Sequence, residues 1–154
     1  MNAKTCLLLP ITLALFACAS VPVQPLMRPA ADQQGEVVVY RESAFAAGAV
    51  GLAVGVDGKP VAVLENTEKV RLLLPAGPHS LYVQARSANP TQVTVQVAPG
   101  ATVCLRTGAN SNTYLKIIVP MTLITSGYNF HLDPVRCPSQ EELATYKDIP
   151  VSYQ

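Results

Sequence analysis

The sequence has little of the chemistry on which most enzymes and metal proteins depend. His79 and His131 are its two histidines, and neither has another histidine or a cysteine at metal-site spacing. No serine lies in a Gly-x-Ser-x-Gly turn, so a hydrolase triad has no support. No Gly-x-Gly-x-x-Gly motif occurs either, which argues against a dinucleotide site. We therefore predict no enzyme activity, no cofactor and no metal.

The sequence also lacks a surplus of one charge. The chain of 154 residues has 11 basic and 10 acidic side chains. Nucleic-acid binding relies on a basic excess that neutralises phosphates, so we expect no nucleic-acid partner. A membrane-spanning helix needs roughly 20 apolar residues, and no uninterrupted run reaches that length. The segment 44–56 is apolar, but its thirteen residues between Glu42 and Asp57 are too few to span a bilayer.

The N-terminus is built like a secretory signal peptide. Residues 1–17 carry one positive charge, Lys4, then an apolar segment that Pro10 interrupts, and the small residue Ala17 at the cleavage edge. The sequence thus predicts export, with residues 1–17 removed.

The end of this leader, Leu15-Phe16-Ala17-Cys18, resembles the lipobox of bacterial lipoproteins. That resemblance implies cleavage before Cys18, a diacylglycerol on its sulfur and, in most such proteins, a further acyl chain on its amino group. Two or three acyl chains hold a protein on a membrane firmly. Ala19 follows in place of the aspartate typical of inner-membrane retention, which favours the periplasmic face of the outer membrane. The alternative is an ordinary signal peptide cut near Ala17 or Ala19, with Cys18 incidental.

Cleavage before Cys18 leaves 137 residues, enough for one domain with a core. Residues 18–34 contain three prolines and no regular period, which predicts a lipidated cysteine followed by a flexible tether reaching up to ~50 Å. We expect a single folded domain over 35–154.

Within that domain the pattern is that of β-strands. In 49–56 large residues alternate with Ala and Gly, Asp57-Gly58 supplies a hairpin turn, and similar period-2 runs recur at intervals of 8 to 12 residues. We predict an all-β fold, a β-sandwich of immunoglobulin or transthyretin type. The expected strands are 36–41, 49–56, 60–65, 69–74, 79–86, 91–98, 101–108, 113–119 and 128–132.

One C-terminal segment breaks the β pattern. Ser139 stands three residues before Glu142, the spacing of a capping box, which predicts a short helix over about 139–147. Leu143 and Tyr146 share one side of it, so we expect the helix to lie against the sandwich.

A family resemblance covers roughly residues 36–107. A Tyr-Arg pair, a small-residue segment, the hairpin VDGK and the turn PAGPH, followed by an aromatic strand, are similar to an uncharacterised family of small bacterial lipoproteins. The turn also resembles PEGA-type β domains of bacterial surface proteins. These motifs are turns rather than reactive groups, so the resemblance implies a β fold and an envelope location, and no activity.

The four cysteines are expected to have different roles, according to their positions in the sequence. Cys6 leaves with the signal peptide and Cys18 carries lipid, so Cys104 and Cys137 remain in an oxidising compartment. We predict a disulfide between them that holds the helix over the second face of the sheet, with two free thiols as the alternative.

The function predicted from these features is non-enzymatic. A lipid-anchored envelope protein would bind or scaffold another envelope protein or the cell wall, with Tyr40, Arg41 and Phe45 as a possible partner patch. The alternative for this patch is that Tyr40 packs in the first strand and Arg41 faces solvent.

Two other functions stay open. One is inhibition of a cell-wall-attacking enzyme such as lysozyme, with the loop 107–113 entering its cleft. The other is an accessory role in a secretion machine.

Overall fold

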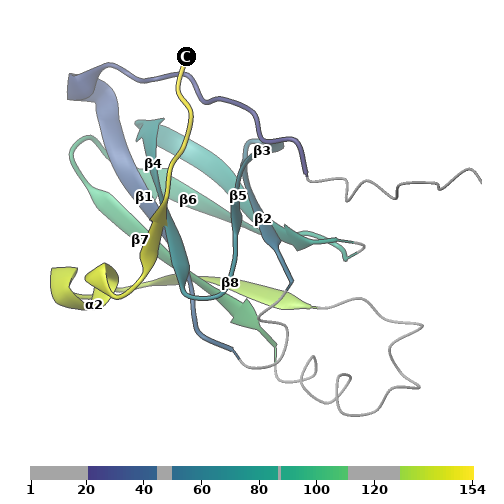
Figure 1. Cartoon of the computed structure of the whole chain (residues 1–154). Coiled ribbons are helices and arrows are strands. Elements are labelled where there is room, and N and C mark those ends of the chain that lie inside the picture. Colours follow the sequence, from purple (N-terminus) through teal and green to yellow (C-terminus); the bar gives the residue numbers. More distant parts are fainter. Residues whose placement is uncertain (1–20, 45–49, 87, 111–128) are drawn as a thin grey trace, which may run out of the picture.

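The structure is a computed structural model that describes residues 21–44, 50–86, 88–110 and 129–154. Two β-sheets pack face to face, and one short helix lies at the side of the sandwich (Figure 1). The predicted all-β sandwich with a C-terminal helix is thus confirmed. The predicted strand 113–119 lies outside the described residues.

The four-stranded sheet is antiparallel throughout, whereas the five-stranded sheet is mixed. The four-stranded sheet has the order β3-β2-β5-β6, and the five-stranded sheet the order β8-β7-β1-β4-β9. In the latter β1 runs parallel to β7, and β4 runs parallel to β9. The bounds are β1 Gln34–Arg41, β2 Leu52–Val56, β3 Lys59–Leu64, β4 Glu68–Pro75, β5 Gly77–Ala85, β6 Thr91–Val97, β7 Thr102–Ala109, β8 Phe130–Val135 and β9 Lys147–Ile149.

The hairpin between β2 and β3 turns on Asp57 and Gly58, as predicted. Both residues have positive φ, 49° and 80°, which matches the two-residue turn whose twist fits paired strands. His79 buttresses this turn: its Nδ1 lies 2.8 Å from Asp57 Oδ2 and its Nε2 lies 2.9 Å from Pro75 O. This histidine therefore fills a corner of the fold.

The main core lies between the sheets, and a second, smaller core lies on the outer face of the five-stranded sheet. Strand β1 contributes to both: Val37 and Val39 point into the main core, whereas Val38 and Tyr40 belong to the second. Burial on two faces explains why this strand is a continuous apolar run instead of an alternation.

The helix is shorter than predicted. Helix α2 spans Gln140–Ala144, and the Ser139 hydroxyl accepts a hydrogen bond from Glu142 N at 3.1 Å, as the capping box requires. The chain then leaves the helix, and residues 147–149 form β9 beside β4. The backbone N–H of Lys147 donates to Thr67 O at 3.0 Å, so pairing with the sheet replaces a further helical turn.

The predicted tether over 18–34 also needs correction. Leu26 is buried and forms a parallel bridge with Tyr153, and the 3₁₀ turn η1 (Ala31–Gln33) leads directly into β1. Gln24 N donates to Pro60 O at 2.7 Å. Figure 1 shows this segment crossing the top of the sandwich next to the C-terminal end. The folded part therefore begins about ten residues before the predicted Gly35.

Candidate functional site

The predicted partner patch does not form as a surface. Tyr40 is 6% exposed and Arg41 is 1% exposed, while Phe45 lies outside the described residues. The prediction was wrong for the first two because β1 is the central strand of its sheet and is covered on both faces. The alternative is confirmed for Tyr40, which packs in the second core, and is wrong for Arg41, which does not face solvent.

The buried side chain of Arg41 instead links β1 to β3 and to the segment before β2. Its Nη1 donates to Val50 O at 2.5 Å and to Leu64 O at 3.0 Å, and its guanidinium lies 5.3 Å from the centroid of the Phe130 ring. Burial lowers the pKa of Arg41, while the charges of Glu65 and Glu68 act in the opposite direction. A buried cation with carbonyl and aromatic partners stabilises this end of the fold.

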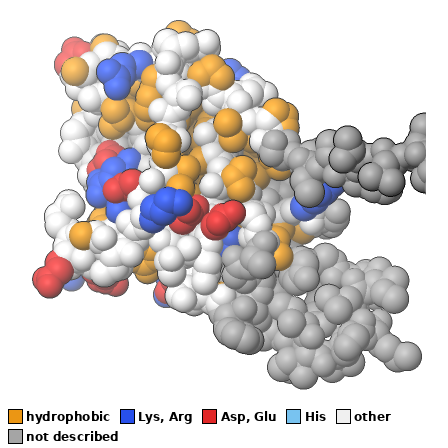
Figure 2. All heavy atoms as spheres, in the orientation of Figure 1, with side chains coloured by type: hydrophobic (Ala, Val, Ile, Leu, Met, Phe, Trp, Pro, Cys, Tyr) orange, Lys and Arg blue, Asp and Glu red, His pale blue; other side chains and the backbone are white. Residues whose placement is uncertain are grey.

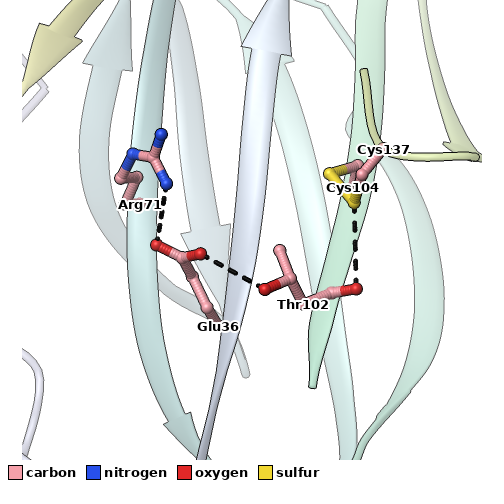
Figure 3. Close-up of a disulfide and its surroundings, with 5 residues drawn as sticks. All are labelled: Glu36, Arg71, Thr102, Cys104 and Cys137. Atoms are coloured by element: carbon pink, nitrogen blue, oxygen red, sulfur yellow. Dashed lines mark hydrogen bonds and ion pairs between the residues drawn. A yellow bond between two sulfur atoms is a disulfide. The ribbon is translucent and has the colours of Figure 1, made fainter. Parts of the chain in front are cut away.

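The second core is closed by the predicted disulfide. Cys104 on β7 and Cys137, just before α2, have their sulfurs 2.07 Å apart (Figure 3). Cys137 Sγ also lies 3.8 Å from Thr102 O. A disulfide sulfur carries no proton, so we interpret this approach as a contact and not a hydrogen bond. The bond ties the start of α2 to the sheet, as the sequence predicts.

Two tyrosines pack within this second core. The rings of Tyr40 and Tyr146 meet edge to face with centroids 5.2 Å apart. Burial, together with the nearby carboxylates of Glu42 and Glu142, raises the pKa of both phenols. Both hydroxyls therefore stay neutral at physiological pH, and the pair serves packing.

Lys69 is a structural residue that the sequence analysis missed. Its ammonium is buried and donates to Leu143 O at 2.8 Å and Tyr146 O at 2.6 Å, and it lies 3.0 Å from Asp148 Oδ2. The cation thus binds a carbonyl in the last turn of α2 and another just after the helix, where it interacts favourably with the negative end of the helix dipole. The register of β1 and β4 explains this role. Lys69 pairs with Tyr40, so its side chain lies on the face of the sheet that α2 covers.

A polar row lies along β7 and β8 beside this core. Arg106 Nη1 lies 3.5 Å from Glu42 Oε1, and Asp133 Oδ2 is 4.0 Å from both Arg106 Nη2 and His131 Nε2. Arg106 Nε and His131 Nε2 are buried atoms that have no hydrogen-bond partner in the described part of the chain. These two atoms lie inside the row, whereas the side chains of Glu42, Arg106 and Asp133 are 41–52% exposed. We interpret it as a polar contact surface.

A shallow hollow of about 250 Å³ opens on the outer face of the four-stranded sheet. Its walls include Val21, Ala53, Pro60 and Tyr82. Gly55 makes room for the tyrosine: a Cβ on this glycine would lie 2.1 Å from the Tyr82 ring. Gln84 and Arg86 also line the hollow, so it is part apolar and part polar, and the described residues that line it include no carboxylate, cysteine or serine.

The N-terminal segment borders this hollow and carries the large hydrophobic side chains that the described residues expose most. Val21, Val23 and Met27 are 42%, 52% and 75% exposed. Figure 2 shows hydrophobic side chains scattered over the upper part of the molecule, with charged side chains at its edges and a band of charged side chains beneath.

No metal-binding cluster of His, Cys, Asp or Glu occurs among the residues that the structure describes. Within the same residues, no helix is long and apolar enough to cross a membrane. The predicted lipidation site Cys18 lies outside them, as do residues 111–113 of the predicted loop 107–113, whose first three residues belong to β7.

No family model, curated protein or solved structure matches this chain.

Proposed function

We propose that the protein is a non-enzymatic, lipid-anchored component of a bacterial cell envelope that binds or scaffolds another envelope protein or the cell wall. The observation that carries the proposal is the Cys104–Cys137 disulfide, which fits an exported chain in an oxidising compartment. A third cysteine, Cys18, stands at the lipobox-like end of the leader and would be the site of lipid attachment. The resemblance to small envelope lipoproteins remains part of this proposal, as does the location on the periplasmic face of the outer membrane.

The anchor is tested first. Cells expressing the full chain are labelled with radioactive palmitate, and the wild type is compared with Cys18→Ser and Cys6→Ser. Thioether formation needs the thiol of residue 18, so we expect label on the wild type and on Cys6→Ser, and none on Cys18→Ser. Equal label on all three would disprove the lipid anchor.

The partner function is tested by cross-linking in intact cells. The polar row of Glu42, Arg106, His131 and Asp133 replaces the predicted patch as the surface to probe, since arginine is common at interfaces and the side chains of Glu42, Arg106 and Asp133 are 41–52% exposed. A photo-reactive residue at Arg106 should capture one defined envelope component, identified by mass spectrometry. The exposed Gln96 on β6 is the matched control. Equal capture from both positions would reject this surface.

The two other functions predicted from the sequence remain open, and no described contact favours either. Addition of the purified protein to a lysozyme assay at micromolar concentration tests inhibition. A secretion-machine role would appear in the same cross-linking experiment as capture of a membrane-spanning partner.

A further inference from the structure

The exposed apolar side chains of the N-terminal segment have a fixed position on the fold. Leu26 is 9% exposed and belongs to the main core, while Val23 and Met27 on either side are open to solvent. The backbone is held at three points: Gln24 N donates to Pro60 O, Leu26 N to Ser152 O at 2.9 Å, and Arg28 N to Gln154 O at 3.2 Å. The segment thus has an inner face bound to the domain and an outer apolar face.

This outer face lies close to the proposed lipid. Only three residue steps separate Cys18 from Val21, and an extended chain covers at most about 3.6 Å per residue, roughly 11 Å in total. The acyl chains on Cys18 would be in the bilayer, so Val21 would lie within about that distance of the lipid headgroups. Gln24, which is hydrogen-bonded to Pro60 of the domain, would lie within roughly 22 Å.

We propose that Val21, Val23 and Met27 insert into the headgroup region of the bilayer and lay this end of the domain on the membrane surface. The inference rests on the proposed lipidation of Cys18. Apolar side chains gain free energy when they leave water for the boundary of the acyl region. Arg28, whose guanidinium lies 5.4 Å from the centroid of the Tyr153 ring, places a cation beside them at the level of anionic headgroups.

The contact is measured on the full lipidated protein in vesicles of phosphatidylethanolamine and phosphatidylglycerol. Val23→Cys, Met27→Cys and Glu141→Cys are each labelled with an environment-sensitive fluorophore. With Cys18 acylated and Cys104 bonded to Cys137, the new thiol is the one that reacts. Glu141 on α2 is exposed and is the control. Brominated lipids quench fluorophores that they touch, so we expect quenching several-fold stronger at 23 and 27 than at 141.

A second variant separates insertion of the segment from insertion of the dye. Met27→Asp keeps the fold because its side chain is 75% exposed, but it puts a charge into the apolar face. We expect it to reduce quenching of the label at Val23 at least twofold. Met27→Leu should leave the quenching unchanged.

The possible outcomes are distinguishable. A protein that does not float with the vesicles overturns both the lipid anchor and the bilayer contact. A protein that floats, but whose labels at 23 and 27 are quenched no more than the label at 141, overturns the bilayer contact alone. Blue-shifted emission at 23 and 27 without quenching would assign this face to a second copy of the chain and would also overturn the proposal.

Discussion

At the scale of single residues, two buried cations stabilise one end of the β-sandwich, because Arg41 ends β1 and Lys69 pairs with its neighbour Tyr40. Arg41 and Lys69 are each almost fully buried, and both donate hydrogen bonds to backbone carbonyls that are shielded from solvent. Buried cations are expensive unless such partners satisfy them. Their loss should therefore weaken the fold more than the loss of an exposed lysine.

Lys69→Met tests this at the C-terminal end of α2. Methionine has a similar length, so it fills the space but leaves Leu143 O and Tyr146 O without their donor. We expect the free energy of unfolding to fall by about 2 kcal/mol, measured by urea denaturation. Lys59→Met, at an exposed position on β3, is the control and should change stability by less than about 0.5 kcal/mol. Equal effects of the two substitutions would refute a specific role for Lys69.

Glu68 should make the stability of the fold depend on pH. Burial alone would raise the pKa of Glu68, but hydrogen bonds from Lys147 and from Glu65 N, with the charges of Lys147 and Arg41, lower it below the usual 4.5. A carboxyl with a depressed folded pKa stabilises the fold above its unfolded pKa and loses this effect as pH falls through the folded value.

The measurement compares Glu68→Gln with the wild type across pH by urea denaturation. The variant should be the less stable at about pH 7, and the difference should shrink below about pH 4. Glu65→Gln, at an exposed neighbouring position, should show a small difference throughout. A gap that is constant with pH would mean that Glu68 acts through packing and not through its charge.

At the scale of elements, the disulfide and Lys69 hold opposite ends of helix α2 on the sheet. Cys137 precedes the helix and binds β7, whereas Lys69 on β4 binds the carbonyls at its end. The helix has five residues, too few to be stable alone in water, so its position depends on these attachments.

Cys137→Ser removes the first attachment. The two cysteines are 33 residues apart, and for a loop of that length the chain-entropy estimate gives about 4 kcal/mol. We expect the melting temperature to fall by more than ten degrees, on the order of the shift that this loss implies for a small domain. Mass spectrometry of the unreduced wild type should show the loss of two hydrogens. The contrary result is a wild-type protein whose Cys104 and Cys137 both react with iodoacetamide after unfolding without reductant.

Most elements were predictable because their cause is local. The alternation of large and small residues in β2, the Asp57-Gly58 turn and the capping box at Ser139 each depend on a few neighbouring residues. Strand β9 was missed because a three-residue strand is stabilised by its parallel partner β4 and has no period of its own. The prediction of the partner patch was wrong for a related reason. The central position of β1, which buries Tyr40 and Arg41, follows from its pairing with β4 and β7 and not from neighbouring residues.

At the scale of the whole molecule, the N-terminal segment is part of the fold rather than a spacer. Leu26 packs in the main core and pairs with Tyr153, whose hydroxyl accepts a hydrogen bond from Leu73 N at 2.8 Å. Prolines 22, 25 and 29 suggested an extended linker, and the segment is extended, but it lies on the domain. Its attachment to residues 152–154 was not predictable, because these partners are more than 120 residues away in the sequence.

Leu26→Ala should loosen this attachment, and Met27→Ala provides a neighbouring control. Loss of a buried leucine side chain costs about 2 kcal/mol, whereas truncation at an exposed position costs little. We expect faster hydrogen exchange at the amides of Leu26 and Gln154 in Leu26→Ala, and unchanged exchange in Met27→Ala. Equal rates in both variants and the wild type would contradict the docking of the segment.

The bridge between Leu26 and Tyr153 also determines the order in which the chain can fold. A chain that crosses a membrane from its N-terminus delivers residue 26 long before residue 153, and closing so long a loop is entropically slow. Until then Leu26 lacks its bridge to Tyr153 and its hydrogen bonds with Ser152 and Gln154. A chaperone that binds apolar segments would therefore act at the start of this chain and leave when its C-terminal residues arrive.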